Sequence, residues 1–171
     1  SVRIDSLNFN PDGTIQKVVP TLRGVGLTKA RSHIQIDRYS ALQGKGIGID
    51  YLDKNNCFAG WKTLFSQSNT ALIYNKVDFG NEKVAEITVR AKSPKGGVLV
   101  VRADGKKGNI IAKVKIPKSA AWKNVRAQVL HAPLGVHALY VSLQSGADVE
   151  VDWLGFDALP WEKGAFETHQ Y

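Results

Sequence analysis

The sequence predicts an all-β protein, namely a jelly-roll β-sandwich of roughly nine to ten antiparallel strands preceded by a short hairpin connector. Three observations lead to this prediction. Apolar and polar residues alternate with a period of two, turn residues such as Pro, Gly, Asn and Asp recur at even spacing, and no segment has the period of an amphipathic helix. The chain of 171 residues suits one such domain plus a connector.

The first part of the chain differs from the rest. Asn10-Pro11-Asp12-Gly13 is a strong tight-turn signal between two short apolar runs, Leu7–Phe9 and Ile15–Val19. A hairpin is therefore expected here, and Pro20 and Gly24-Val25-Gly26 follow it. The predicted division is a connector over 1–28, the sandwich over 29–158 and a C-terminal tail over 159–171.

The strand pattern is clearest in segment 84–92, where Ala85, Ile87, Val89 and Ala91 share one face and Glu86, Thr88, Arg90 and Lys92 share the other. Segment 110–116 alternates in the same way. Such strands have one face in the core and one in water. The full set of predicted strands is 33–40, 45–51, 71–79, 84–92, 97–104, 110–116, 123–131, 135–144 and 149–157.

Composition limits the function classes. Cys57 is the single cysteine, so an internal disulfide and a cysteine-rich zinc site are both excluded. The net charge of +8 invites a nucleic-acid partner, but the lysines are scattered through strands and turns, which favours a solvated surface. No apolar run is long enough to span a membrane. A chain that begins at Ser1 without methionine is expected to be a piece of a longer one.

Catalytic signatures are missing from the sequence. A glycosidase needs two carboxyl groups across a cleft, and no pair has an evident acid and base partnership. The G-x-S-x-G, H-E-x-x-H, phosphate-loop and dinucleotide motifs are also missing. His137 lies in an apolar strand, so we predict a structural, hydrogen-bonded histidine.

Acidic residues alternate along the first and last core strands. Gln35 and Asp37 share one face, as do Asp148, Glu150 and Asp152. If the sandwich places these strands side by side, the oxygen atoms converge in a way that suits calcium. Spacing alone leaves open the alternative of exposed strand acids.

Two groups of aromatic residues are candidates for ligand binding. Trp122 follows a polar stretch that is expected to be a loop, and Phe58, Trp61 and Phe65 surround a second predicted loop. Two rings from loops at one end of a sandwich can clamp the apolar face of a sugar ring. Half-buried packing is the alternative interpretation of Trp122.

At this point the sequence resembles a known family, the family 6 carbohydrate-binding modules, from about Arg31 to Asp157. Six segments match in order and spacing: Ile34–Ser40, Tyr74–Gly80, Gly96-Gly97 leading into Val98–Asp104, Ile116-Pro117 up to Trp122, Gly135–Tyr140 and Val151-Asp152-Trp153. The resemblance implies a jelly roll with a structural Ca²⁺ ligated by Gln35, Asp37 and Asp152. The family often has Glu at the position of Asp37. The Asp side chain is shorter and reaches less far toward the ion.

The resemblance also implies a sugar site. Trp122 corresponds to one stacking aromatic, and Trp61 or Phe65 can supply the opposing ring. Glu150 stands where the family commonly has an Asn that bonds a sugar hydroxyl, and a carboxylate can still accept such bonds. Some family members use a second site on the concave sheet face, whose residues the sequence does not identify here.

The hairpin segment Leu7–Val18 resembles the end of the catalytic domain in family 43 glycoside hydrolases that carry such a module. This implies an upstream catalytic domain in the same chain, acting on arabinan, xylan or galactan, and an extracytoplasmic location. The expected partner is a plant-type polysaccharide or oligosaccharide, with no nucleic acid and no membrane span.

The sequence leaves four hypotheses for the function of the chain. The leading one is a non-catalytic polysaccharide-binding module of a secreted glycoside hydrolase. The first alternative is a structural spacer that supports the catalytic domain and binds no sugar, which the change to Glu150 favours slightly. The others are a binder of nucleic acid or acidic glycans, driven by the charge of +8, and an independent enzyme.

Overall fold

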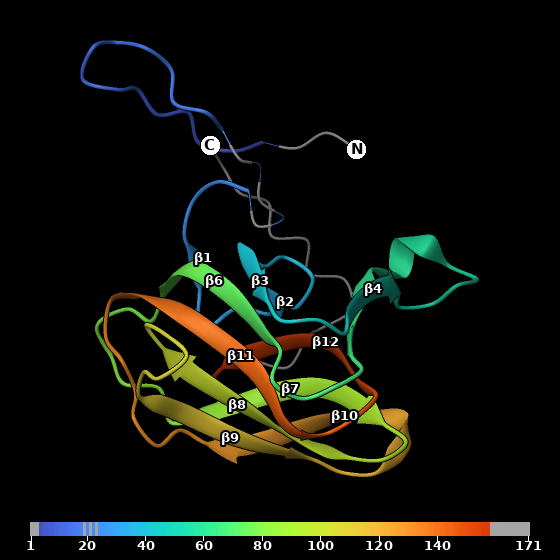
Figure 1. The fold of residues 1–171 in the computed structure, drawn as a ribbon. Coiled ribbons are helices and arrows are strands. Elements are labelled where there is room, and N and C mark those ends of the chain that lie inside the picture. The colour runs from blue at the N-terminus through green and yellow to red at the C-terminus, as the bar shows by residue number, and fades with distance from the viewer. Residues whose placement is uncertain (1–3, 19, 21, 23, 158–171) are drawn as a thin grey trace.

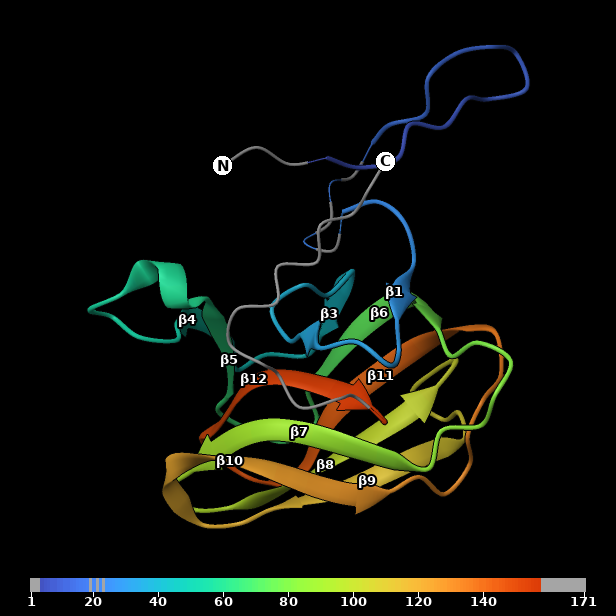
Figure 2. The same cartoon turned by 180° about the vertical axis from the view of Figure 1, so that it is seen from behind.

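The computed structural model describes residues 4–18, 20, 22 and 24–157. Two β-sheets pack against each other with the core between them (Figure 1), and the view from behind shows β7, β10 and β12 in front (Figure 2). The predicted all-β sandwich is confirmed. Among the described residues, no helix is long and apolar enough to cross a membrane.

The first sheet has six strands in the order β1-β6-β11-β8-β9, with β3 also paired to β6. Their bounds are β1 (Thr28–Lys29), β3 (Ala41–Gln43), β6 (Ala71–Asp78), β8 (Gly97–Ala103), β9 (Ile110–Ile116) and β11 (Val136–Gly146). β1 and β6 pair in parallel, and the other pairings in this sheet are antiparallel.

The second sheet also has six strands, in the order β10-β7-β12-β5-β4, with β2 paired to β12. Their bounds are β2 (Ile34–Gln35), β4 (Ile47–Tyr51), β5 (Trp61–Phe65), β7 (Glu86–Ser93), β10 (Ser119–Gln128) and β12 (Val149–Phe156), and a short 3₁₀ turn, Cys57–Ala59, joins β4 to β5. Every pairing in this sheet is antiparallel.

The alternation seen in the sequence sets the core. In β7, Ile87, Val89 and Ala91 are fully buried between the sheets, as the period of two predicts. Ala85 is an exception, because it precedes β7 and is exposed. Each large apolar side chain buried in this way stabilises the fold by about 1.5–3 kcal/mol.

Three predicted boundaries are wrong. The segment 33–40 is not one strand, because β2 ends at Gln35 and the chain crosses to the first sheet, where β3 begins at Ala41. The segment 61–65 is a strand and not a loop. β10 begins at Ser119, so Trp122 lies on an edge strand and not in a loop. In the last two segments, pairing with neighbouring strands produces a strand where the sequence indicated a loop.

The N-terminal hairpin is confirmed. An antiparallel bridge joins Phe9 to Ile15, and the Gly13 N–H donates to the Asn10 carbonyl at 3.0 Å. Gly13 has a φ of +82°, which glycine adopts without strain. The hairpin stands away from the two sheets (Figures 1 and 2). The predicted tail, 159–171, lies outside the described residues.

Candidate functional site

Trp122 lies on the outer face of the second sheet, pointing away from the core. The register of β10 against β7 shifts between Ser119 and Lys123, so Trp122 falls in an irregular part of the ladder. Its indole ring lies 5.2 Å from the Arg90 guanidinium carbon and 5.1 Å from Lys92 Nζ, measured to the ring centroid. These distances are typical of cation–π contacts, and Trp122 as a whole is half-buried.

Glu150 is the next residue across the sheet. Its Oε2 atom lies 2.8 Å from Lys62 Nζ and 3.2 Å from Lys92 Nζ. Burial opposes ionisation of this carboxyl, but its interactions with the two lysines outweigh burial and lower the pKa of Glu150 below its ordinary value. We call Trp122, Arg90, Lys92, Glu150 and Lys62 together the charged outer face.

Asp152 is the extra residue of a β-bulge. Val151 pairs with Ala91 and Trp153 pairs with Arg90, so β12 has one residue more than β7 at this point. A bulge re-aims the side chain that it inserts. The Asp152 carboxylate is 7% exposed and contacts the guanidinium of Arg90. Arg90 therefore joins the buried acid to the indole of Trp122.

The structure places the backbone of Gln35 opposite Trp153, next to Asp152, and the carboxylates of Asp37 and Asp152 interact with each other. β2 pairs with β12, and the Ile36 N–H donates to the Asp152 carbonyl at 3.0 Å. Burial raises the pKa of Asp37. Burial likewise raises the pKa of Asp152, Arg90 opposes that rise, and the charge of Asp37 adds to it.

The residues present fit a hard cation in the kind of donor that they supply. Gln35, Asp37 and Asp152 can each offer an oxygen ligand, and the buried Asp152 and half-buried Asp37 carboxylates, which interact with each other, benefit from a positive charge between them. Asp148 is not part of this group, since it pairs with Lys95 at 2.7 Å. Among the described residues, no three His, Cys, Asp or Glu side chains gather as metal ligands.

Trp61 does not meet Trp122, so the predicted two-ring clamp is not formed. On β5, Trp61 points to the same side as buried Thr63, whereas Lys62 points to the charged outer face. Trp61 extends past the core, is 42% exposed and stacks on Tyr51 with ring centroids 4.3 Å apart. The two tryptophans therefore lie on opposite faces of one sheet.

Phe65 must be corrected as a stacking residue. It has no exposed surface, because it occupies the inward side of β5 and packs in the core. Phe58, from the same aromatic group, is 95% exposed on the turn between β4 and β5. Of the aromatic residues predicted to stack, Trp122 alone lies among the charged groups of the outer face.

Sequence reasoning did not assign Arg90, Lys92 and Lys62 to the site. The alternation in 84–92 had placed Arg90 and Lys92 on the polar face of their strand, which was a usable signal. Lys62 gave no such signal, because β5 was not expected. His137 is confirmed as a hydrogen-bonded residue, with Nδ1 at 2.6 Å from Asp104 Oδ2 and Nε2 at 2.9 Å from the Leu134 carbonyl oxygen.

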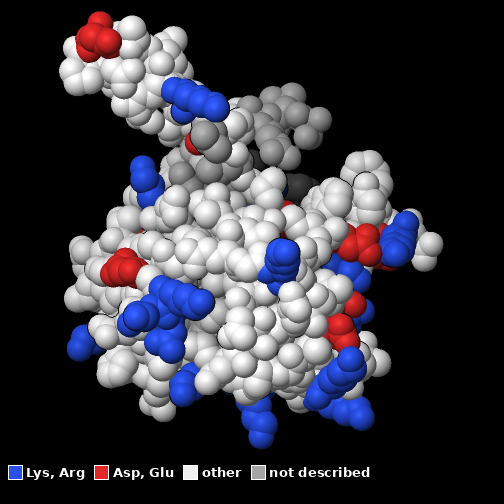
Figure 3. All heavy atoms as spheres, viewed as in Figure 1, with Lys and Arg blue, Asp and Glu red and all other residues white. Residues whose placement is uncertain are grey.

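A separate hollow of about 290 Å³ lies on the outer face of the first sheet. Gln43, Thr70, Arg102, Lys106 and Tyr140 are among its lining residues. Figure 3 shows this side of the molecule, where Lys and Arg side chains are spread over the surface with few Asp or Glu among them. This hollow is a second candidate surface for a ligand.

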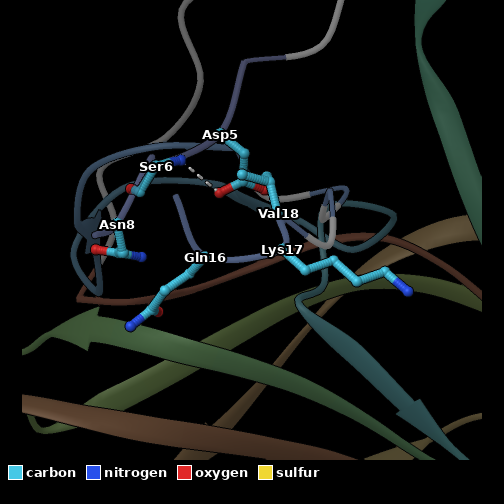
Figure 4. Close-up of a pocket in the computed structure, with 6 residues that line it drawn as sticks. All are labelled: Asp5, Ser6, Asn8, Gln16, Lys17 and Val18. Atoms are coloured by element: carbon cyan, nitrogen blue, oxygen red, sulfur yellow. Dashed lines mark hydrogen bonds between the residues drawn. The ribbon is translucent and has the colours of Figure 1, made fainter. Parts of the chain in front are cut away.

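A smaller hollow of about 150 Å³ lies in the N-terminal hairpin (Figure 4). Asp5, Ser6, Asn8, Gln16 and Lys17 line it together with Val18, and the Ser6 N–H donates to Asp5 Oδ1 at 2.8 Å. Its lining is mostly polar and belongs to one short hairpin. We assign it no ligand.

The fold and the outer face define a β-sandwich binding module. Comparison with protein families makes this specific, because residues 43–158 match the profile of the carbohydrate binding module (family 6). The chain therefore belongs to the family 6 carbohydrate-binding modules, as the resemblance implied. No curated protein matches the chain in sequence. Family membership gives no support to a spacer that binds no sugar.

Solved structures share the fold. CsCBM6-3 from Clostridium stercorarium, in complex with cellobiose, is 20% identical with a TM-score of 0.69, and the match covers 78% of this chain and 98% of that one. A second similar structure is a glycoside hydrolase family 43 arabinoxylan arabinofuranohydrolase from Bacillus subtilis in complex with cellotetraose. It is 16% identical with a TM-score of 0.69, and the match covers 91% of this chain and 33% of that one. A CBM36 module in complex with calcium and xylotriose is 14% identical with a TM-score of 0.54, and the match covers 73% of this chain and 98% of that one.

Proposed function

We propose that this module binds a polysaccharide or oligosaccharide on the charged outer face, by stacking a sugar ring on Trp122. The observation that carries the proposal is the position of the indole: it is partly exposed on an outer sheet face and surrounded by groups that form hydrogen bonds. An aromatic ring binds the apolar face of a pyranose, while polar groups nearby set its orientation.

The expected affinity is modest. Burying roughly 50 Å² on each side of a ring contact contributes on the order of 1 kcal/mol. Adding a few hydrogen bonds gives dissociation constants from about micromolar to millimolar. Such weak binding still raises the local concentration of an attached enzyme on its substrate.

We infer that the module is a non-catalytic part of a longer, secreted glycoside hydrolase. Leu7, Phe9 and Ile15 on the N-terminal hairpin are 53–60% exposed, and an isolated hairpin is marginally stable in water. An upstream catalytic domain would cover these side chains. The match to the family 43 enzyme supports this, because it extends over 91% of the chain. An extracytoplasmic location follows from this proposal.

A structural Ca²⁺ at Gln35, Asp37 and Asp152 is the second part of the proposal. When bound, the ion would neutralise the carboxylates of Asp37 and Asp152 and hold β2 against β12. Thermal unfolding in CaCl₂ and in EDTA tests this, with a higher melting temperature expected in calcium. Asp37→Asn should remove the difference, and equal melting temperatures for the unchanged protein would exclude the ion.

The binding proposal is tested with two matched tryptophan variants. Trp122→Ala should lose at least about tenfold in affinity for the glycan that the module binds, while its melting temperature stays close to that of the parent. Trp61→Ala also removes an exposed indole, but from the opposite face, and should bind normally. Unchanged titration heats for Trp122→Ala would overturn the proposed site.

A further inference from the structure

We propose that the saccharide bound at Trp122 carries an acidic group, the carboxylate of a uronic acid, and that Lys62 and Lys92 receive it. This inference rests on the proposed function and names the substrate class of the same site. It starts from the row of side chains that crosses β10, β7, β12 and β5, which is Trp122, Lys92, Glu150 and Lys62.

The two lysines of this row converge on one carboxylate. Three cations, Lys62, Arg90 and Lys92, share two carboxylates, Glu150 and Asp152. Arg90 uses Asp152, so Lys62 and Lys92 share Glu150, while Asp50, which faces Lys62 from β4, pairs with Lys54 at 3.4 Å and also interacts with Lys62. Both ammonium groups approach the same atom, Glu150 Oε2, at 2.8 and 3.2 Å. Two like charges are therefore held close together around one carboxylate oxygen.

The two lysines also have more hydrogen-bond donors than their contacts with Glu150 use. An ammonium group has three donors and no acceptor, so one contact to Glu150 leaves each lysine with further N–H groups. The carboxylate is already engaged by two cations, and a neutral hydroxyl that approaches it has to compete with them. A second carboxylate can accept from both lysines at once, and its charge lowers the repulsion between them.

The position of the two lysines strengthens their attraction for an anionic group. Side-chain exposure is 15% for Lys62, 26% for Lys92 and 25% for Glu150. Charges that are partly withdrawn from solvent are screened less than those on an open surface. Lys92 Nζ also lies 5.1 Å from the Trp122 ring centroid. A sugar that stacks on the indole thus holds its substituents beside the lysines.

Attraction by the overall charge of +8 is the competing explanation. It predicts that any lysine on the surface contributes equally, including Lys106 in the hollow on the first sheet. The proposal predicts an effect only from the row beside Trp122. It also predicts an effect of opposite sign at Glu150, because removal of that carboxylate frees the two lysines for the ligand.

The experiment compares uronic-acid oligosaccharides with the same compounds after reduction of the carboxyl group to an alcohol, by calorimetric titration of the whole chain. Oligosaccharides of glucuronoxylan, polygalacturonan and alginate provide three backbones. In 150 mM salt, the acidic form of the bound compound should bind about tenfold more tightly than its reduced form, since the two differ by one charge pair.

The variants locate the effect. Lys62→Gln and Lys92→Gln should each lower this preference several-fold, and Glu150→Gln should raise it. Lys106→Gln, which removes the same charge from the other sheet, should leave it unchanged. Thermal melting of each variant checks its folding, and Glu150→Gln keeps the test decisive even if a lysine variant folds poorly, since it must increase binding.

The outcomes separate the two proposals. If the reduced compounds bind as tightly as the acidic ones and Trp122→Ala abolishes both, the inference is wrong and the proposed function stands. If no compound and no neutral glycan binds, the proposed function itself is wrong. If Lys106→Gln lowers the preference and Lys92→Gln does not, an acidic sugar binds elsewhere and the inference is overturned.

Discussion

The two faces of the second sheet use the same strands for different purposes. On the inner face, Phe65, Ala91 and Val151 are fully buried and form part of the core. On the outer face, their neighbours Lys92 and Glu150 form ion pairs around Trp122. A step of one residue along a strand thus moves from the core to the binding face, so substitutions on the two faces should affect different properties.

Phe65→Ala should have the largest effect and should act on folding alone. Removing a fully buried phenylalanine leaves a cavity and costs about 3–5 kcal/mol in the free energy of unfolding. Chemical denaturation measures this loss. The fraction that remains folded should bind glycan with the affinity of the parent. A binding defect larger than the loss of folded protein would show that the two faces are not independent.

Arg90→Gln should have an intermediate effect, because Arg90 connects the two regions. Its removal leaves the Asp152 carboxylate, which is 7% exposed, without its ion-pair partner, at a cost of about 1–3 kcal/mol. The proposed Ca²⁺ would offset part of this loss, so the variant should gain more from calcium than the parent does.

The matched control for Arg90 is Arg126→Gln. Arg126 lies 3.6 Å from Glu86 on the outer face, and both side chains are well exposed. Its loss should cost less than about 0.5 kcal/mol. Equal costs for the two arginine variants would mean that Asp152 does not depend on Arg90.

Thr63→Val tests a buried polar group on the inner face of the second sheet. The Thr63 hydroxyl is buried and has no hydrogen-bond partner within the described part of the chain. Valine has a similar shape without the polar atom, so the variant should be more stable by about 1 kcal/mol. Thr70→Val is the control, because the Thr70 hydroxyl donates to the Lys45 carbonyl at 2.6 Å and its removal should destabilise. Both values come from denaturant unfolding curves.

The division between these faces explains what the sequence could predict. Alternation in 84–92 and 110–116 predicts buried and exposed positions because side chains in a strand point to opposite sides by geometry alone. The approach of Gln35 and Asp37 to Asp152 was conditional on the first and last strands being neighbours, and β2 does pair with β12.

Three features of the site depend on contacts that the sequence does not encode locally. The row from Trp122 to Lys62 depends on the order β10-β7-β12-β5, which joins residues far apart in the chain. The bulge at Asp152 changes the alternation in β12, so counting residues fails there. The pattern of β5 has both Trp61 and Phe65 on one side, and only the packing shows that Phe65 is inside.

The last expected effect concerns the first sheet and measures a single exposed ion pair. Both ring nitrogens of His137 face acceptors, the Asp104 carboxylate and the Leu134 carbonyl, and the phenyl ring of Phe79 lies beside them. The hydrogen bond to Asp104 is the main cause that raises the pKa of His137 above its ordinary value of 6.5. A raised pKa in the folded state means that protonation stabilises folding. This contribution is fully present below about pH 6.5 and is lost as the pH rises through the folded-state pKa.

Asp104→Asn isolates this contribution. The stability difference between the parent and this variant should be largest at pH 5.5–6, of the order of 1 kcal/mol or less, and should shrink above neutral pH. Unfolding curves at several pH values measure the difference, and an NMR titration of the His137 ring gives its pKa directly. A difference that grows with pH would show that the neutral imidazole is the favoured form. The contribution of this exposed pair should be smaller than that of the ion pairs around Trp122, where Lys62, Lys92 and Glu150 are more deeply withdrawn from solvent.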